Sequence, residues 1–219
     1  MRVSIIIPMW NVVDTIAETL TSALKQNYEG FEIVCVDDAD PSNSFETALD
    51  AIGKLRSHIL VKFILNHTNR GLAGARNVGL LAASNGGAVL PLDADDLLHP
   101  DYLARTVPLL TEGVDVVSTA MQYFGERHDL IYPQKTTIAA NEMPVTSLIR
   151  RSALEAVGGW SEDVMYEDWD LWLKLFKRGG QVAFLNEPLF FYRVGLNRYS
   201  EMENKNREKH LQQLRDRHA

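Results

Sequence analysis

Short apolar runs alternate with helix-patterned segments over the first hundred residues. The apolar runs occur at residues 3–8, 31–36, 61–65 and 88–92, and such uninterrupted runs are typical of strands buried on both faces. Apolar side chains recur at helical spacing in residues 14–27, 45–55 and 72–83, which predicts a helix in each segment. This alternation predicts an α/β fold, in which helices cover both faces of a mainly parallel (mixed) sheet.

The second half of the chain is less regular. A helix is expected from residue 100 to about 110 and a short one at 152–157. Residues 165–176 place Trp169, Trp172, Leu173 and Phe176 at helical spacing, which predicts a helix with a wide buried face. Strands are expected at residues 114–119, 121–124, 130–132, 182–185 and 189–194.

We expect one domain over residues 1–199, with halves at 1–99 and 100–199, followed by a charged helix or tail at residues 200–219. Leu211 and Leu214 are the main aliphatic residues of that tail. It is therefore predicted to be a solvent-facing or frayed helix, and contact with a partner or a second copy is the alternative.

Three carboxylates follow the apolar run at residues 88–92. They belong to Asp93, Asp95 and Asp96. Carboxylates crowded at the end of a buried strand raise one another's pKa and are costly unless something positive lies there. Mg²⁺ and Mn²⁺ take oxygen ligands and bind phosphate oxygens, so a divalent cation is one solution. A solvated turn in which Asp96 or Asp101 caps the next helix is the alternative for such a short pattern.

Polar residues also follow the other predicted strands of the first half. Trp10 and Asn11 follow the first strand, Asp38 follows the second, and Arg70 and Gly71 lie in the loop after the third. The carboxyl ends of parallel strands meet at one edge of a sheet, and ligands bind there. The sequence therefore predicts a nucleotide with its metal ion at this edge.

Composition narrows the class of protein. The net charge is −7 and no block of Lys and Arg precedes the tail, which argues against nucleic acid as a partner. The single cysteine, Cys35, lies in an apolar run, so we expect a buried thiol and no disulfide. No signal pattern or apolar stretch of about 20 residues occurs. A soluble, cytoplasmic protein is expected, and peripheral membrane contact stays open.

Five motifs, in order, resemble the family 2 glycosyltransferases of the GT-A fold. They are residues 4–11 (SIIIPMWN), 32–38 (EIVCVDD), 69–79 (NRGLAGARNVG), 92–96 (LDADD), and 158–160 (GGW) with 167–172 (EDWDLW). Their order and spacing match that family from residue 3 to about 194. The resemblance implies an inverting transfer of a sugar from a nucleotide diphosphate donor, most often UDP-linked, to an acceptor hydroxyl, with Mn²⁺ or Mg²⁺ as cofactor.

The resemblance also implies roles for single residues. Residues 1–99 would bind the donor and 100–199 the acceptor. Asp38 would hydrogen-bond the uracil, Asp93 would contact the ribose and the metal, and Asp95 would be the direct metal ligand. The implied donor-binding residues are Pro8, Trp10, Asn11, Asp38, Arg70, Gly71, Gly74, Asp93, Ala94, Asp95 and Arg198.

Asp168, with Glu167 beside it, matches the family's general base. A helix N-terminus favours the ionised carboxylate that a base requires. Asp170 lies about 200° further around the helix, so it cannot face the same acceptor. First-turn capping is the alternative for Glu167 and Asp168. Trp169 and Trp172 fit a core better than a sugar platform, and Arg76 and Asn77 fit a structural role as well as a functional one.

The chain departs from the family pattern in two places. Many members carry a histidine metal ligand shortly after the Tyr-Arg pair, but Tyr192-Arg193 is followed by residues 194–198 (VGLNR). Asn197, solvent or Arg198 would complete the site, which leaves the need for the metal open. The family's Asp-Asp-Gly-Ser run is changed to residues 37–41 (DDADP), which alters the loop but keeps Asp38.

Two other functions are compatible with parts of the pattern. A non-catalytic nucleotide- or sugar-binding module would need the same loops but not the acids. A nucleotidyltransferase would need a glycine-rich basic loop after the first strand, and residues 9–13 (MWNVV) lack one. The sugar, the acceptor (glycan, lipid-linked or protein), the pathway (surface polysaccharide or other glycan assembly) and the oligomeric state, including a homodimer, are left open.

Overall fold

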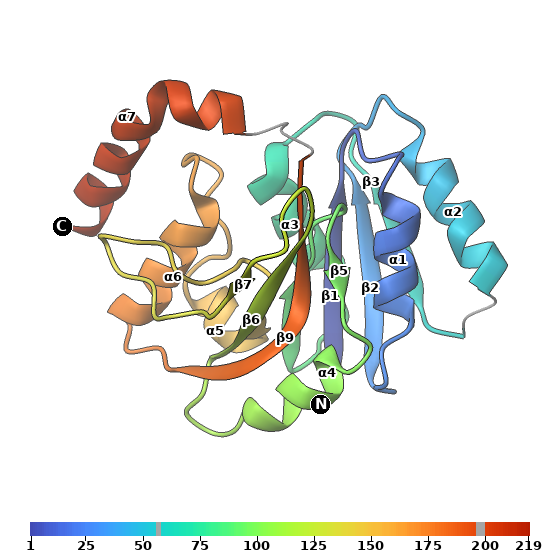
Figure 1. The fold of residues 1–219 in the computed structure, drawn as a ribbon, viewed down its shortest axis with the longest axis horizontal. Helices are drawn as coiled ribbons and strands as arrows, with labels where there is room; N and C mark the ends of the chain where they lie inside the picture. The colour runs from blue at the N-terminus through green and yellow to red at the C-terminus, as the bar shows by residue number, and fades with distance from the viewer. Residues whose placement is uncertain (56–57, 196–199) are drawn as a thin grey trace.

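The computed structural model describes residues 1–55, 58–195 and 200–219, with the backbone alone at residues 200–205 (Figure 1). The strands are β1 Val3–Met9, β2 Phe31–Asp37, β3 Val61–Leu65, β4 Ala88–Pro91, β5 Leu97–Leu98, β6 Val116–Gly125, β7 Leu130–Ile131, β8 Leu148–Arg150 and β9 Val182–Val194. The α-helices are α1 Ile16–Leu24, α2 Ser44–Leu55, α3 Gly71–Ala82, α4 Tyr102–Thr106, α5 Arg151–Ala156, α6 Glu167–Lys177 and α7 Ser200–His218, and a 3-10 turn, Val107–Leu109, follows α4.

The strands form one mixed sheet with the order β3-β2-β1-β4-β8-β6-β9-β5. Strands β1 to β4 are parallel to one another. Strand β8 is antiparallel to both β4 and β6, and β9 is parallel to β6. Consequently β6 and β9 run in the same direction as the first four strands, and their carboxyl ends reach the same edge. This edge receives more loops than the sequence predicted, because the second half contributes two of them.

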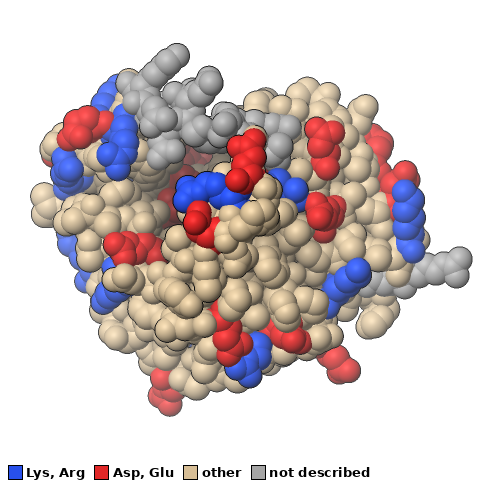
Figure 2. All heavy atoms as spheres, in the orientation of Figure 1, with Lys and Arg blue, Asp and Glu red and all other residues tan. Residues whose placement is uncertain are grey.

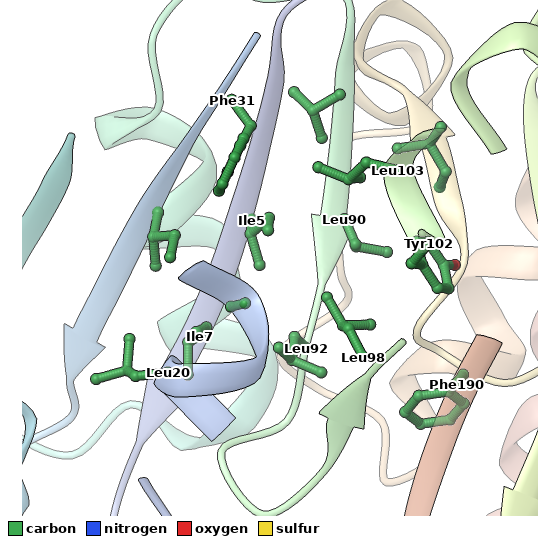
Figure 3. Packing of buried hydrophobic residues seen from close by; sticks show 14 of the residues in the cluster. Ile5, Ile7, Leu20, Phe31, Leu90, Leu92, Leu98, Tyr102, Leu103 and Phe190 are labelled. Atoms are coloured by element: carbon green, nitrogen blue, oxygen red, sulfur yellow. The ribbon is translucent and has the colours of Figure 1, made fainter. Parts of the chain in front are cut away.

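Apolar side chains alternate between the two faces of the sheet. Ile5 and Ile7 of β1 belong to a core cluster that contains Leu20 of α1 (Figure 3). Ile6 points to the opposite face and packs in a cluster with Leu80 of α3 and Trp172 of α6. Both faces of β1 are thus buried, as its uninterrupted apolar run predicted. Cys35 is fully buried in the first cluster, as expected, and the described residues contain no disulfide.

The predicted elements of the first half are confirmed to within a few residues, whereas two predictions in the second half are wrong. Residues 114–119 and 121–124 are not separate strands but lie on β6, and residues 182–185 and 189–194 both lie on β9. The register of these two strands shifts around Ala120, opposite Pro188. Residues 186–187 are polar and lie in this β-bulge without a partner on β6. They interrupt the apolar pattern of the sequence, but the strand continues past them.

The prediction of a solvent-facing or frayed tail is also wrong for the end of α7. Leu211 and Leu214 are buried against Trp169 of α6. The same helix end places His218 Nε2 2.8 Å from the buried carboxylate of Asp170. In Figure 1, α7 accordingly lies alongside α6. Two apolar side chains three positions apart and the ion pairs of Arg217 and His218 with the buried Asp170 attach the end of α7 to α6.

Candidate functional site

The carboxyl ends of β1 and β2 carry the first group of predicted site residues. Pro8 is buried, whereas Trp10 is 48% exposed at the rim. Asp38 is buried, and its carboxylate accepts hydrogen bonds from Asn66 Nδ2 at 2.8 Å and from the backbone N–H of Arg70 at 2.9 Å. The loop after β3 is therefore tied to the end of β2, and the predicted convergence of these segments is confirmed.

The segment that begins α3 depends on two glycines. Gly71 has a φ of +73°, which favours glycine, and Asn69 Oδ1 accepts a hydrogen bond from its N–H at 3.0 Å. A Cβ on Gly74 would lie 2.7 Å from Arg70 Cβ. The Arg70 guanidinium reaches both carboxylate oxygens of Glu162 at 3.2 Å. Gly74 thus allows Arg70 to fold back over the helix toward the second half of the chain.

The acidic stretch after β4 is held by one residue of β9. Arg193 donates its backbone N–H to Asp96 Oδ1 at 2.8 Å and its Nε–H to the carbonyl oxygen of Asp95 at 2.7 Å. Its guanidinium also lies 4.4 Å from the centre of the Phe124 ring on β6. Burial, together with Asp95 and Asp93, raises the pKa of Asp96 well above its usual value. Asp96 therefore supports the loop from inside, and its interpretation as a helix cap is wrong.

A buried guanidinium connects the acidic stretch to the predicted catalytic helix. Arg76 of α3 is 1% exposed and contacts Asp93 Oδ1 at 2.6 Å and Glu167 Oε1 at 2.7 Å. Burial opposes its charge, but Asp93 and Glu167 raise the pKa of Arg76 above its usual value. The guanidinium therefore stays charged. This bridge brings together acids that are far apart in the sequence.

Asp168 lies in the first turn of α6, and its Oδ2 accepts a hydrogen bond from Asn141 Nδ2 at 2.8 Å. Burial raises the pKa of Asp168, although Asn141 and Arg76 act against that rise. Burial and the neighbouring Asp168 likewise raise the pKa of Glu167 to about 7, despite the opposing charge of Arg76. Glu167, next to the Arg76 guanidinium, is therefore suited to taking up a proton near neutral pH, and the pKa of Asp168 is raised in the same direction.

Asp170 points to the other side of α6, as the helical spacing predicted. It is fully buried, and its Oδ2 accepts a hydrogen bond from Ser161 Oγ at 2.6 Å and lies 3.2 Å from Lys174 Nζ. Arg217 and His218 of α7 contact its Oδ1. Asp170 is thus occupied in attaching α6 to its neighbours. Trp172 is fully buried and Trp169 is 6% exposed, which confirms the prediction that both are core residues.

The residues present fit a divalent cation held mainly by substrate. Among the described residues, no group of three or more His, Cys, Asp or Glu side chains could hold a metal ion alone. Asp93 and Asp95 offer carboxylate oxygens, and Mg²⁺ in proteins is commonly bound by one or two carboxylates, substrate phosphates and water. Arg198 and Asn197, which the sequence offered as substitutes for the absent histidine, lie outside the described residues.

Some contacts of the site were not predicted. Arg76 shares a buried face of α3 with Ala73 and Leu80, and an arginine on an apolar face was a signal that it has buried acidic partners. Asn141 gave no signal, because it lies in the irregular segment before β8. Asn77 holds the backbone of Trp160 by accepting from its N–H at 3.0 Å and donating to its carbonyl at 2.8 Å.

Charges of both signs are mixed on one face of the molecule. On the face shown in Figure 2, Lys and Arg side chains are interspersed with Asp and Glu. Nucleic-acid-binding faces instead concentrate one sign of charge. Among the described residues, none of the helices is sufficiently long and apolar to cross a membrane.

Comparison with known proteins connects this geometry to one family. A model described as glycosyl transferase family 2 matches residues 4–163, and one described as glycosyl transferase family group 2 matches residues 144–215. EpsE of Bacillus subtilis is 31% identical over 86% of this chain and 72% of its own length. WfaP of Escherichia coli, a UDP-Glc:alpha-D-GlcNAc-diphosphoundecaprenol beta-1,3-glucosyltransferase, is 29% identical over 88% of this chain and 77% of its own length.

Two solved structures have a similar fold. S. aureus TarS in complex with UDP matches with a TM-score of 0.73 and 25% identity, over 89% of this chain and 61% of the TarS chain. The mannosyltransferase PcManGT of Pyrobaculum calidifontis, in complex with GDP-Man and Mn²⁺, matches with a TM-score of 0.76 and 23% identity, over 97% of this chain and 62% of its own. The chain thus spans less than two thirds of these structures.

Proposed function

Because the chain belongs to glycosyl transferase family 2 and is a glycosyltransferase of the GT-A fold, we propose that it transfers a sugar from a UDP-linked donor to an acceptor hydroxyl with inversion at the anomeric carbon. In this proposal Asp168 is the general base, and Asp93 and Asp95 hold a divalent cation. The donor occupies the edge where β1, β2, β3 and β4 end.

One observation carries the proposal. Arg76 bridges Asp93 at 2.6 Å and Glu167 at 2.7 Å, so the acids after β4 and those at the start of α6 line one site. A non-catalytic binding module would have no use for this second set of acids. Asp168, next to Glu167, then lies across from the stretch that would hold the diphosphate.

The proposed chemistry follows from that arrangement. The acceptor oxygen attacks the anomeric carbon from the side opposite the diphosphate, and Asp168 takes the hydroxyl proton. The bond between the anomeric carbon and the diphosphate oxygen breaks, and its electron pair stays on that oxygen. Asn141, hydrogen-bonded to Asp168 Oδ2 at 2.8 Å, orients the carboxylate toward the acceptor. The ion pair with Arg76 holds the Glu167 carboxylate at the site.

A cation supplies positive charge for the leaving diphosphate when it is bound. Asp95 and Asp93 would hold it by their carboxylate oxygens, with Arg193 fixing the backbone of Asp95. Solved structures of similar fold support this assignment, since PcManGT and GalNAc-T7 are described with Mn²⁺.

The donor and acceptor classes are inferred from relatives. TarS is described with UDP and with UDP-GlcNAc, and WfaP acts on a diphosphoundecaprenol-linked sugar. We therefore infer a UDP-sugar as donor and a lipid-linked or polysaccharide glycan as acceptor.

The test separates donor binding from chemistry. Asp168→Asn keeps the size of the side chain but removes the base, so UDP release from UDP-glucose or UDP-GlcNAc should fall by about 10²–10⁴-fold. The affinity for UDP, measured by calorimetry, should stay within about twofold, a factor worth roughly 0.4 kcal/mol. Turnover that survives the substitution would overturn the assignment of the base.

A further inference from the structure

The loops after β1 and β2 are joined by a single carboxylate, that of Asp40. Its Oδ1 accepts a hydrogen bond from the backbone N–H of Asn11 at 2.6 Å, across a sequence separation of 29 residues. Its Oδ2 accepts one from the backbone N–H of Ser44, the first residue of α2, at 3.0 Å. A second link runs alongside, because the N–H of Val12 donates to Ser44 Oγ at 3.1 Å.

Backbone strain is concentrated in the same place. Among the described residues, the only ones other than glycine with positive φ are Asn11, Ala39 and Asn43, at 56°, 58° and 59°. All three lie in the two loops that Asp40 joins. A left-handed backbone is unfavourable for Ala39 and is better tolerated by asparagine, so at Ala39 in particular it persists only where surrounding contacts impose it. Such strain is typical of sites that must be held ready for a ligand.

Capping of α2 alone does not explain these contacts. A helix cap needs one oxygen of Asp40, and Oδ2 serves that purpose. The other oxygen, Oδ1, accepts from the N–H of Ser42 at 3.1 Å within its own loop and also from Asn11, which belongs to the other loop and immediately follows the exposed Trp10. Meanwhile the N–H of Asp38 donates to the carbonyl oxygen of Met9 at 2.9 Å, so Asp38 and Trp10 are held side by side at the ends of adjacent strands.

We propose that Asp40 is a positioning residue for nucleotide recognition, which locks Asn11 in its left-handed conformation and so presents Trp10 beside Asp38 to the base of a nucleoside diphosphate. This inference rests on the proposed function. Asp40 does not touch the nucleotide but acts through Asn11 and Trp10. It therefore governs binding of the base and leaves the binding of the diphosphate, near Asp93 and Asp95, unaffected.

The size of the effect follows from the population of the locked loop. If loss of the Asp40 carboxylate lowers that population to about one tenth, the dissociation constant of a nucleoside diphosphate rises about tenfold. Inorganic pyrophosphate has no base, so its affinity should not change. A general loosening of the domain would instead weaken both ligands together.

The experiment is a calorimetric titration of UDP, GDP, dTDP, CDP and inorganic pyrophosphate, each with Mn²⁺, into wild type and Asp40→Ala. The control is Glu32→Gln, which removes a buried carboxylate between β1 and β2 at the opposite end of the strands. We expect Asp40→Ala to weaken the preferred nucleotide about tenfold with pyrophosphate unchanged, and Glu32→Gln to change neither.

Each remaining outcome has a distinct meaning. Equal weakening of nucleotide and pyrophosphate, or no weakening of either, would overturn the role of Asp40. A wild-type protein that binds none of the four nucleotides would overturn the proposed function itself. If Asp40→Ala does not fold, Asn11→Pro replaces it. Proline lacks the N–H that donates a hydrogen bond to Asp40, and it cannot adopt a φ of 56°. The hydrogen bond from the Ser44 N–H to Asp40, which caps α2, remains intact. It should produce the same selective loss.

Discussion

Removal of the Arg76 guanidinium is the sharpest perturbation of the bridge between the two sets of acids. Arg76→Met preserves much of the side-chain volume in the apolar layer beside Ala73 and Leu80. It leaves Asp93 and Glu167 facing one another without the cation that now lies 2.6 and 2.7 Å from them. Breaking a buried ion pair by removing one partner costs about 3–5 kcal/mol. For a chain of this size, this corresponds to a fall in Tm of roughly 6–20 °C.

The pH dependence of that loss distinguishes electrostatics from packing. The folded-state pKa of Glu167 is already raised to about 7, and removal of Arg76 should raise it further. A raised carboxyl pKa contributes stability that is present below the unfolded pKa and lost as the pH rises through the folded pKa. The destabilisation by Arg76→Met should therefore be larger at pH 8 than at pH 5.

Urea unfolding of wild type and Arg76→Met at both pH values measures the effect. Arg105→Met is the matched control, since Arg105 pairs with Glu187 at the surface, and its stability should hardly change at either pH. The double variant Arg76→Met with Glu167→Gln should recover part of the loss, because one uncompensated carboxylate is removed. A loss below about 1 kcal/mol, the size of an ordinary substitution, or one equal at pH 5 and pH 8, would show that Arg76 does not neutralise buried charge here.

Three further predictions follow from single contacts. Burial acts to raise the pKa of Glu32, but hydrogen bonds from Lys62, Ser84 and Ser4 outweigh it and lower the pKa to about 2. Glu32→Gln should therefore cost about 3 kcal/mol of unfolding free energy at pH 7, a cost that disappears as the pH falls from about 4.5 to 2. Ala39→Gly should stabilise the protein by up to about 1 kcal/mol in urea unfolding, because glycine tolerates the φ of 58°, and unchanged or lower stability would contradict that. UDP release should slow as the pH is lowered through about 7, where Glu167 takes up a proton, and the raised pKa of Asp168 shifts its protonation in the same direction. A rate that is flat from pH 8 to pH 5 would exclude both acids.

The first half of the chain could be predicted closely because its signals are local. Uninterrupted β-branched runs define β1 and β2, and a parallel sheet brings the residues after them to one edge, so Trp10, Asp38 and Arg70 were expected to converge. The positions of these residues depend on strand direction alone. Their roles toward a ligand remain predictions.

The second half was harder because its structure depends on long-range contacts. At the bulge between β6 and β9, polar residues interrupt the apolar pattern of β9 although the strand continues. Asn141 contacts Asp168 from a segment that has no hydrophobic periodicity. The docking of α7 depends on Leu214, which the tail sequence shows, and on the buried charge of Asp170, which lies outside the tail and cannot be read from it. Similarly, the partners of Arg76 on α3 lie after β4 and at the start of α6, so they can be identified only when the relative positions of all three segments are known.

Titration of UDP, with and without Mn²⁺, into wild type and Asp95→Ala tests the central claim that the acids after β4 complete a nucleotide-sugar site at this edge. We expect wild type to bind UDP, Mn²⁺ to strengthen binding, and the gain from Mn²⁺ to disappear in Asp95→Ala. Saturation at about 100 times the dissociation constant should also stabilise the folded protein by about 2.7 kcal/mol, which a thermal shift would show. An affinity that is the same with Mn²⁺, with a chelator and in Asp95→Ala would show that Asp95 holds no cation for the nucleotide.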